Sequence, residues 1–184
     1  ISAISAAAAI TAISLGNSNK GTVQTCSGNT IADLTSTGGS VLGIVGGATT
    51  VTTFNINNNT ISGLSSSNAG SGVTGIRMLT ASTANVFKNK IYDLSASNAT
   101  GTVSGLDVFG TALGTYNINN NLVGDLRADL TNSTVAIRGI NFSAANAGTA
   151  YNVFYNTVYL NALAGGTNFG TSALSVTVNA TAAN

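Results

Sequence analysis

The charged side chains are the few residues of this sequence that can carry acid, base or ionic chemistry. Of the 184 residues, six are Lys or Arg and five are Asp, and the sequence contains neither Glu nor His. The absence of His excludes Ser/His/Asp and Cys/His catalysis and His-ligated zinc sites. Without Glu, a glycosidase would need two of the five aspartates as its carboxylate pair.

Arg77, Asp107 and Arg138 form the first candidate cluster. Arg77 and Asp107 each stand two residues after a glycine, 30 residues apart, in short apolar segments. If these segments are strands, alternate side chains face outward. Arg77 and Asp107 are then neighbours on one sheet face, with Arg138 close by. The same outward column contains Val45, Asn141 and Thr177.

This cluster could bind a polysaccharide or take part in its cleavage. Asn141 in the same column is a further candidate for contact with carbohydrate. Tyr92 and Tyr159 are two more, because they occupy the same outward place in repeats two coils apart. The simpler interpretation, which we favour, is an exposed ion pair worth less than about 1 kcal/mol and surface tyrosines without a role.

A second column contains Asp33, Asp93 and Asp125, each four residues after a recurring Asn. Asp93 and Asp125 fall on successive repeats, and two stacked carboxylates could share a Ca²⁺ ion, which prefers oxygen ligands. The sequence shows no third acidic ligand for such a site. We therefore favour solvated edge residues that discourage sideways association, and expect no cofactor other than this possible Ca²⁺.

Threonine-rich stretches suggest a third candidate function, the binding of ice. Ice binding on a flat face requires threonines in register on successive coils. The sequence places the candidate threonines in loops of varying length, which makes ice binding the least favoured function; they are Thr49, Thr53, Thr80, Thr83, Thr111 and Thr115.

The elements that must position these residues follow from an internal repeat. An Asn stands two residues before an Ile or Val in five copies, at Asn29, Asn59, Asn89, Asn121 and Asn156. The spacings between the copies are 30, 30, 32 and 35 residues. Leu34, Leu64, Leu94 and Leu126 follow in the first four copies.

Each repeat contains two more short apolar runs, such as Phe54-Asn-Ile56 upstream of the Asn and Val73-Thr-Gly-Ile76 downstream. Runs of this length, bounded by Gly, Asn, Ser and Thr, are typical of strands rather than helices. The sequence therefore predicts an all-β fold: a right-handed parallel β-helix, or β-solenoid, of about five coils with three short strands each. Residues 1–184 are expected to form one such segment of a longer stack.

The recurring Asn has two interpretations. An Asn between two strands can adopt the left-handed conformation of a sharp bend, and stacked Asn amides can bond from coil to coil. The alternative is a ligand-binding role. We favour the structural ladder, because a residue fixed at one corner of every repeat usually serves the bend.

These motifs resemble a known family. The run Gly-Ile followed by x-Asn-Ile/Val-x-x-Asn-x-Ile resembles the parallel β-helix repeat of the pectin-lyase-like superfamily. The run Tyr151-Asn-Val-Phe-Tyr-Asn-Thr-Val-Tyr-Leu160 is similar to repeats of very large secreted surface proteins of Bacteroidota-type bacteria. The resemblance implies a substrate path along a sheet face where acidic and basic side chains converge, but the superfamily includes lyases, hydrolases, adhesins and phage tailspikes.

Composition narrows the function classes. A net charge of +1 lacks the clustered cations of a nucleic-acid-binding protein. The apolar N-terminal run is too short for a membrane span, and the single Cys26 cannot form an internal disulfide. We expect an extracellular structural or adhesive segment of a cell-surface or filament protein, in contact with further repeats or subunits of the same protein. Surface polysaccharide is a further candidate partner. The alternative is a polysaccharide-binding or polysaccharide-cleaving β-helix.

Overall fold

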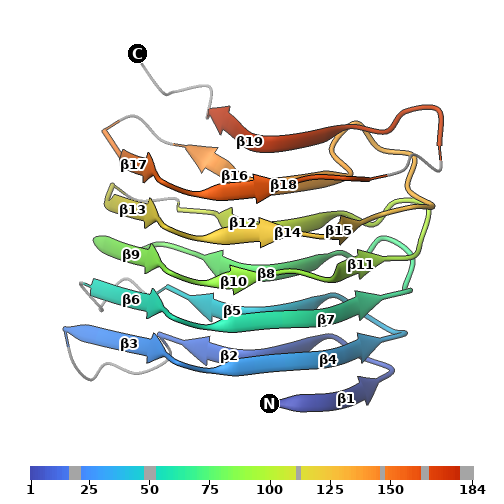
Figure 1. Ribbon diagram of the computed structural model, residues 1–184, viewed down its shortest axis with the longest axis horizontal. Helices are drawn as coiled ribbons and strands as arrows, with labels where there is room; N and C mark the ends of the chain where they lie inside the picture. The colour runs from blue at the N-terminus through green and yellow to red at the C-terminus, as the bar shows by residue number, and fades with distance from the viewer. Residues whose placement is uncertain (17–21, 48–52, 111–112, 146–147, 163–165, 179–184) are drawn as a thin grey trace.

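The protein is a parallel β-solenoid. The computed structural model describes residues 1–16, 22–47, 53–110, 113–145, 148–162 and 166–178, and every regular element among them is a β-strand. In Figure 1 the strands of one sheet run left to right at the front, and those of a second run right to left behind it. The chain climbs from the N-terminus to the C-terminus as it winds, which makes the solenoid right-handed. The predicted fold class is confirmed.

Three parallel sheets form the sides of the coil. Sheet A contains β1 (Ser2–Ala6), β4 (Thr30–Ser36), β7 (Thr60–Ser66), β10 (Lys90–Ile91), β11 (Leu94–Ala96), β14 (Leu122–Gly124), β15 (Leu126–Arg127) and β18 (Thr157–Tyr159). Sheet B contains β2 (Ile10–Leu15), β5 (Val41–Gly46), β8 (Val73–Met78), β12 (Val103–Val108), β16 (Ile137–Ala145) and β19 (Thr171–Val178). Sheet C contains β3 (Val23–Ser27), β6 (Thr53–Asn57), β9 (Thr83–Phe87), β13 (Thr115–Asn119) and β17 (Ala150–Phe154).

Five coils repeat the order sheet C, sheet A, sheet B, and β1 and β2 precede them as part of a coil. Each strand pairs in parallel with its equivalent one coil away, so like side chains stack on like. Ile31 pairs with Ile61, which pairs with Ile91, and all three are fully buried. Val123 and Val158 continue this column. The register predicted from the repeat is therefore confirmed.

The recurring asparagines form a continuous ladder at the corner between sheets C and A. In Asn89, Oδ1 accepts hydrogen bonds from the backbone N–H (3.1 Å) and the Nδ2 (2.9 Å) of Asn59. Its Nδ2 donates to Asn121 Oδ1 at 3.0 Å and to the Ile56 carbonyl at 2.9 Å. All the bonding capacity of this amide is thus used, and Asn89 is 2% exposed. The same pattern runs from Asn29 to Asn156.

The bend itself is made by the residue before each ladder asparagine. Positive φ values occur at this preceding position in every copy, at Gly28, Asn58, Lys88, Asn120 and Tyr155. The ladder asparagines are not among the positive-φ residues. Of the two structural explanations for these asparagines, the amide ladder is correct and the left-handed bend is wrong by one residue.

A column of glycines in sheet B lets the walls approach closely. A Cβ added to Gly105 would lie 2.2 Å from Val123 Cγ1 on sheet A and 2.8 Å from the Gly139 carbonyl on the next coil. Both distances are too short for real contacts, so a side chain at this position would force the sheets apart. This is why Gly stands immediately before the inward Ile or Leu in β5, β8, β12 and β16, whereas the outermost strands β2 and β19 have Ala there.

The fifth coil corrects one sequence prediction. The apolar pattern aligned Thr177 with Asn141, whereas the structure pairs Asn141 with Ser175. The error is a shift of two residues. Because strand side chains alternate with period two, such a shift keeps the same residues facing outward and leaves no signal in the pattern.

The threonines give a second correction. Thr53, Thr83 and Thr115 begin strands β6, β9 and β13 and pair with one another in register, so their assignment to loops was wrong. Thr80 does lie in a loop, while Thr49 and Thr111 fall outside the described residues. The strands start before the apolar runs that revealed them, which is why these positions were misplaced.

The ladder predicts that replacing a buried ladder asparagine costs much more stability than replacing a solvent-facing asparagine on the next coil. Asn89→Ala should lower the free energy of unfolding by at least about 3 kcal/mol, because it leaves two donors of Asn59 and the Ile56 carbonyl buried without partners. Asn117→Ala should cost less than about 1 kcal/mol, because Asn117 faces solvent, where water can replace its bonds to Asn85 and Asn152. Urea unfolding of both variants measures the difference, and equal losses would contradict the role of the ladder.

Candidate functional site

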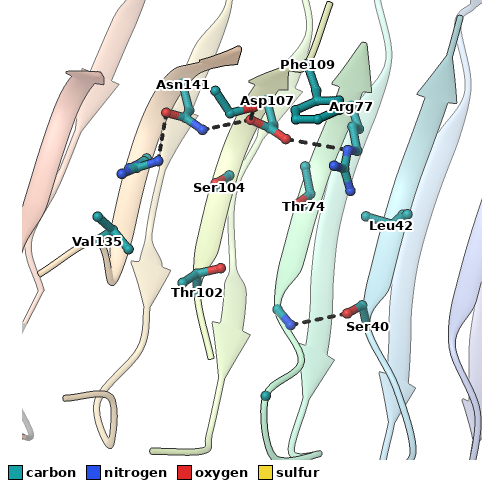
Figure 2. Close-up of a pocket in the computed structure, with 14 residues that line it drawn as sticks. Ser40, Leu42, Thr74, Arg77, Thr102, Ser104, Asp107, Phe109, Val135 and Asn141 are labelled. Carbon is teal, nitrogen blue, oxygen red and sulfur yellow. Dashed lines mark hydrogen bonds and ion pairs between the residues drawn. The ribbon is translucent and has the colours of Figure 1, made fainter. Parts of the chain in front are cut away.

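A concave surface lies on the outer face of sheet B. This sheet B groove has a volume of about 440 Å³ and is formed by outward side chains of β5, β8, β12 and β16 with the loops that flank them. Figure 2 shows Arg77, Asp107 and Asn141 side by side across three adjacent strands. The groove contains the predicted cluster of Arg77, Asp107 and Arg138.

Asp107 is the centre of this cluster. Its Oδ1 accepts hydrogen bonds from Asn141 Nδ2 at 2.7 Å and from Ser143 Oγ at 2.8 Å. Its Oδ2 forms an ion pair with Arg77 Nε at 3.5 Å. The Asp107 side chain is only 11% exposed. The carboxylate is therefore held by three neighbours and presents little of its surface to solvent.

The two arginines occupy different positions around Asp107. The Arg77 guanidinium lies over the Phe109 ring, with its Cζ 5.4 Å from the ring centroid, in the geometry of a cation–π contact. Arg138 Nη1 donates to Asn141 Oδ1 at 3.0 Å. A continuous polar chain thus runs from Arg138 through Asn141 and Asp107 to Arg77, as the dashed lines of Figure 2 trace.

This arrangement favours the binding of a ligand over acid–base catalysis. Hydrolysis of a glycoside by the usual route needs two carboxylates, and Asp107 is the single carboxylate that lines the groove. An arginine stays protonated near neutral pH and is a poor base. With one aspartate already held by two hydrogen-bond donors and an ion pair, and with two cations, the groove has a net charge of +1 and the chemistry of an anion-binding or polar surface.

The carbohydrate candidates are divided between two sheets. Asn141 lies in the groove, but it is 4% exposed and its amide is bonded on both sides. Tyr92 and Tyr159 lie on sheet A, where Tyr159 is 63% exposed and Lys90 Nζ stands 5.5 Å from the centroid of the Tyr92 ring. The structure therefore does not bring the tyrosines and the groove into one site.

The aspartate column on sheet A is a column of left-handed backbone positions. Asp33, Gly63, Asp93 and Asp125 have φ values between 48° and 65°. They bend the chain within β4, within β7, between β10 and β11, and between β14 and β15. Asp, Asn and Gly tolerate this conformation better than other residues. The bend explains why Gly63 takes the place of an aspartate in this column. The sequence alone offered no reason for that exchange.

Arg127 bridges the two carboxylates that were candidates for calcium. Its Nη1 donates to Asp125 Oδ1 at 2.5 Å, and its Nη2 donates to Asp93 Oδ1. The hydrogen bonds from Asp125 and then Asp93 raise the pKa of the Arg127 guanidinium above its usual value, so the group stays charged. A cation thus already occupies the place between the carboxylates. Among the described residues, no three acidic, His or Cys side chains gather as a metal site.

Cys26 faces the core, as its place in the repeat predicts. It is 5% exposed and accepts a hydrogen bond from Asn29 Nδ2 at 3.3 Å. Burial raises the pKa of its thiol. A thiol that remains protonated is a weak nucleophile, and Cys26 serves as a packing residue.

Sequence reasoning missed Phe109, Ser143 and Arg127. Phe109 follows Asp107 by two residues, and Ser143 follows Asn141 by two, so the strand period could have placed both on the outward face. Arg127 stands two residues after Asp125 and 34 after Asp93. The bend at Asp125 concealed its orientation, because alternation fails where the backbone is left-handed.

Comparison with known proteins adds no identity: no family model, curated protein or solved structure matches the chain. In the part of the chain that the structure describes, no helix has the length and apolar character needed to cross a membrane.

The arginine bridge predicts that the protein does not respond to calcium. Addition of millimolar CaCl₂ should leave the melting temperature unchanged, because the Arg127 guanidinium already occupies the place between Asp93 and Asp125. Arg127→Gln should cost about 0.5 kcal/mol for each exposed ion pair. Thermal melts with CaCl₂ or EDTA measure both effects. A calcium-dependent rise in the melting temperature of the unaltered protein would show that a metal displaces Arg127.

Proposed function

We propose that this chain is a non-catalytic segment of an extracellular or cell-surface protein, with a structural or adhesive role. The observation that carries the proposal is the state of Asp107. It is the one carboxylate lining the sheet B groove, and its oxygens are bound by Asn141, Ser143 and Arg77. Such a carboxylate holds neighbouring side chains in place and has no second carboxylate with which to share acid and base work.

The internal order of the solenoid supports a structural role. Three sheets repeat in register, and buried amides with all their bonds made connect the coils. In a stack of this kind each coil contacts only its neighbours, so stability and length grow by addition of similar units.

The fifth coil supports the partners we propose, which are further coils of the same repeat or another subunit. Leu174 continues the buried column of Ile44, Ile76 and Ile140, yet it is 54% exposed. Val176 beside it is 56% exposed. Apolar side chains in core columns are stabilised when another strand covers them.

Polysaccharide binding is a second candidate function, favoured by the groove itself. Arg77 and Arg138 outnumber Asp107, and Phe109 is 36% exposed beside them. A shallow surface with excess positive charge and an aromatic ring fits an acidic glycan. We further propose kinship with the parallel β-helix repeats of the pectin-lyase-like superfamily and of bacterial surface proteins, supported by the repeat motif and the solenoid fold.

The proposal predicts no turnover. Incubation with pectate or alginate should release neither unsaturated sugars, followed by ultraviolet absorbance, nor new reducing ends. The reason is that the groove supplies a single carboxylate, which two hydrogen bonds and an ion pair already hold. Cleavage by the unaltered protein that disappears in Asp107→Asn would overturn the non-catalytic role.

Binding to an acidic polysaccharide should depend on the groove. Affinity electrophoresis through gels containing pectate should show retardation that weakens in Arg138→Gln, because that variant removes the cation bonded only to Asn141 in the cluster. Arg127→Gln is the matched control, since it removes the same charge from sheet A. Equal effects of both variants would indicate nonspecific charge attraction and argue against a groove site.

A further inference from the structure

The outer face of sheet C presents a grid of uncharged side chains, most of them polar. One column contains Thr53, Thr83 and Thr115 on three successive coils. A second column, two residues along each strand, contains Asn55, Asn85, Asn117 and Asn152. The grid therefore repeats every ~4.8 Å from coil to coil and roughly 6.6 Å along each strand.

Hydrogen bonds hold the asparagine column in one conformation. Asn85 Nδ2 donates to Asn55 Oδ1, Asn117 Nδ2 to Asn85 Oδ1 and Asn152 Nδ2 to Asn117 Oδ1, each at 2.8 Å. Side-chain ladders of this kind stabilise flat sheets against the usual twist. Figure 1 shows the five sheet C strands stacked one above another at one end of the molecule. The face is thus ordered before anything binds to it.

The grid retains bonding capacity toward solvent. In Asn85 the ladder uses one N–H and one lone pair of the amide, which leaves one donor and one acceptor. The threonines add a hydroxyl and a methyl group at each step. None of the outward residues of β3, β6, β9, β13 and β17 is charged. The outer faces of sheets A and B differ, because they contain Asp93 and Arg127 or Arg77 and Asp107.

We propose that this sheet C face binds ice. Its occupant is a lattice of water molecules whose surface repeats in two dimensions on the same scale as the grid. A neutral, pre-ordered face in regular register fits such a lattice, because it anchors many waters at fixed spacings without losing side-chain freedom on binding. A charged or flexible face would order water around its own ions instead.

The proposal reverses the sequence-based ranking, which rested on threonines assigned to loops. It is independent of the groove on sheet B and of the function proposed for that groove. A crystalline neutral polysaccharide also has a regular surface and is the competing occupant of this face. The aromatic side chains of this face, Phe87 and the 46% exposed Phe154, stand in a third column beside the asparagines. The ice lattice is favoured because the threonine and asparagine columns themselves present only small hydroxyl, methyl and amide groups.

The experiment measures thermal hysteresis and inhibition of ice recrystallisation. Thr83→Tyr places a bulky ring at the centre of the grid, and Thr35→Tyr is the matched control on the exposed face of sheet A, where Thr35 pairs with Ser65. We expect both ice activities in the unaltered protein and in Thr35→Tyr, and their loss in Thr83→Tyr. Circular dichroism and urea unfolding verify the fold, and Thr53→Tyr replaces Thr83→Tyr if the latter is unfolded.

Two results would overturn the proposal. The first is the absence of ice activity in the unaltered protein, or its full retention in a folded Thr83→Tyr or Thr53→Tyr variant. The second is adsorption to crystalline chitin or cellulose that depends on Thr83 in a protein without ice activity, which would assign the face to a polysaccharide lattice.

Discussion

The asparagine ladder is the interaction on which the other features depend. At the corner between sheets C and A, each interior amide uses both donors and both lone pairs, and it bonds to backbone and side chain of adjacent coils. A slip of one coil by a single residue would bury unpaired amides, whose cost of about 1–3 kcal/mol each is large against the net stability of a domain. The ladder therefore specifies one register, and that register determines which side chains stand beside each other on every outer face.

The outer faces show three consequences of one register. On sheet B the register brings Arg77, Asp107 and Asn141 into one row. On sheet C it aligns Thr53, Thr83 and Thr115, and on sheet A it brings Asp93 and Asp125 within reach of Arg127. In each case residues about 30 positions apart in the chain become neighbours one strand away. Local sequence does not place them together, whereas the repeat does.

Much of this organisation could be predicted because core positions restrict residue types. Ile31, Ile61 and Ile91 recur because the interior is narrow, and Asn59 and Asn89 recur because only an amide satisfies that corner. Polar surface residues lack such restrictions. Thr83 was misplaced because a strand-initiating Thr has no apolar signature, and Ser175 was missed because a two-residue shift preserves alternation. Phe109 could be found from the strand period, because it follows Asp107 by two residues, whereas the left-handed bend at Asp125 breaks that period before Arg127.

Native-state hydrogen exchange of the ladder amides tests the central claim most directly. The backbone N–H groups of Asn59, Asn89 and Asn121 each donate to the side chain of the next ladder asparagine. If the ladder holds the coils together, these protons should exchange only through global unfolding, with the protection of the most stable core amides. Exchange by local opening, while the paired strands β8 and β12 remain protected, would contradict the claim and show that the sheets hold their register without the ladder.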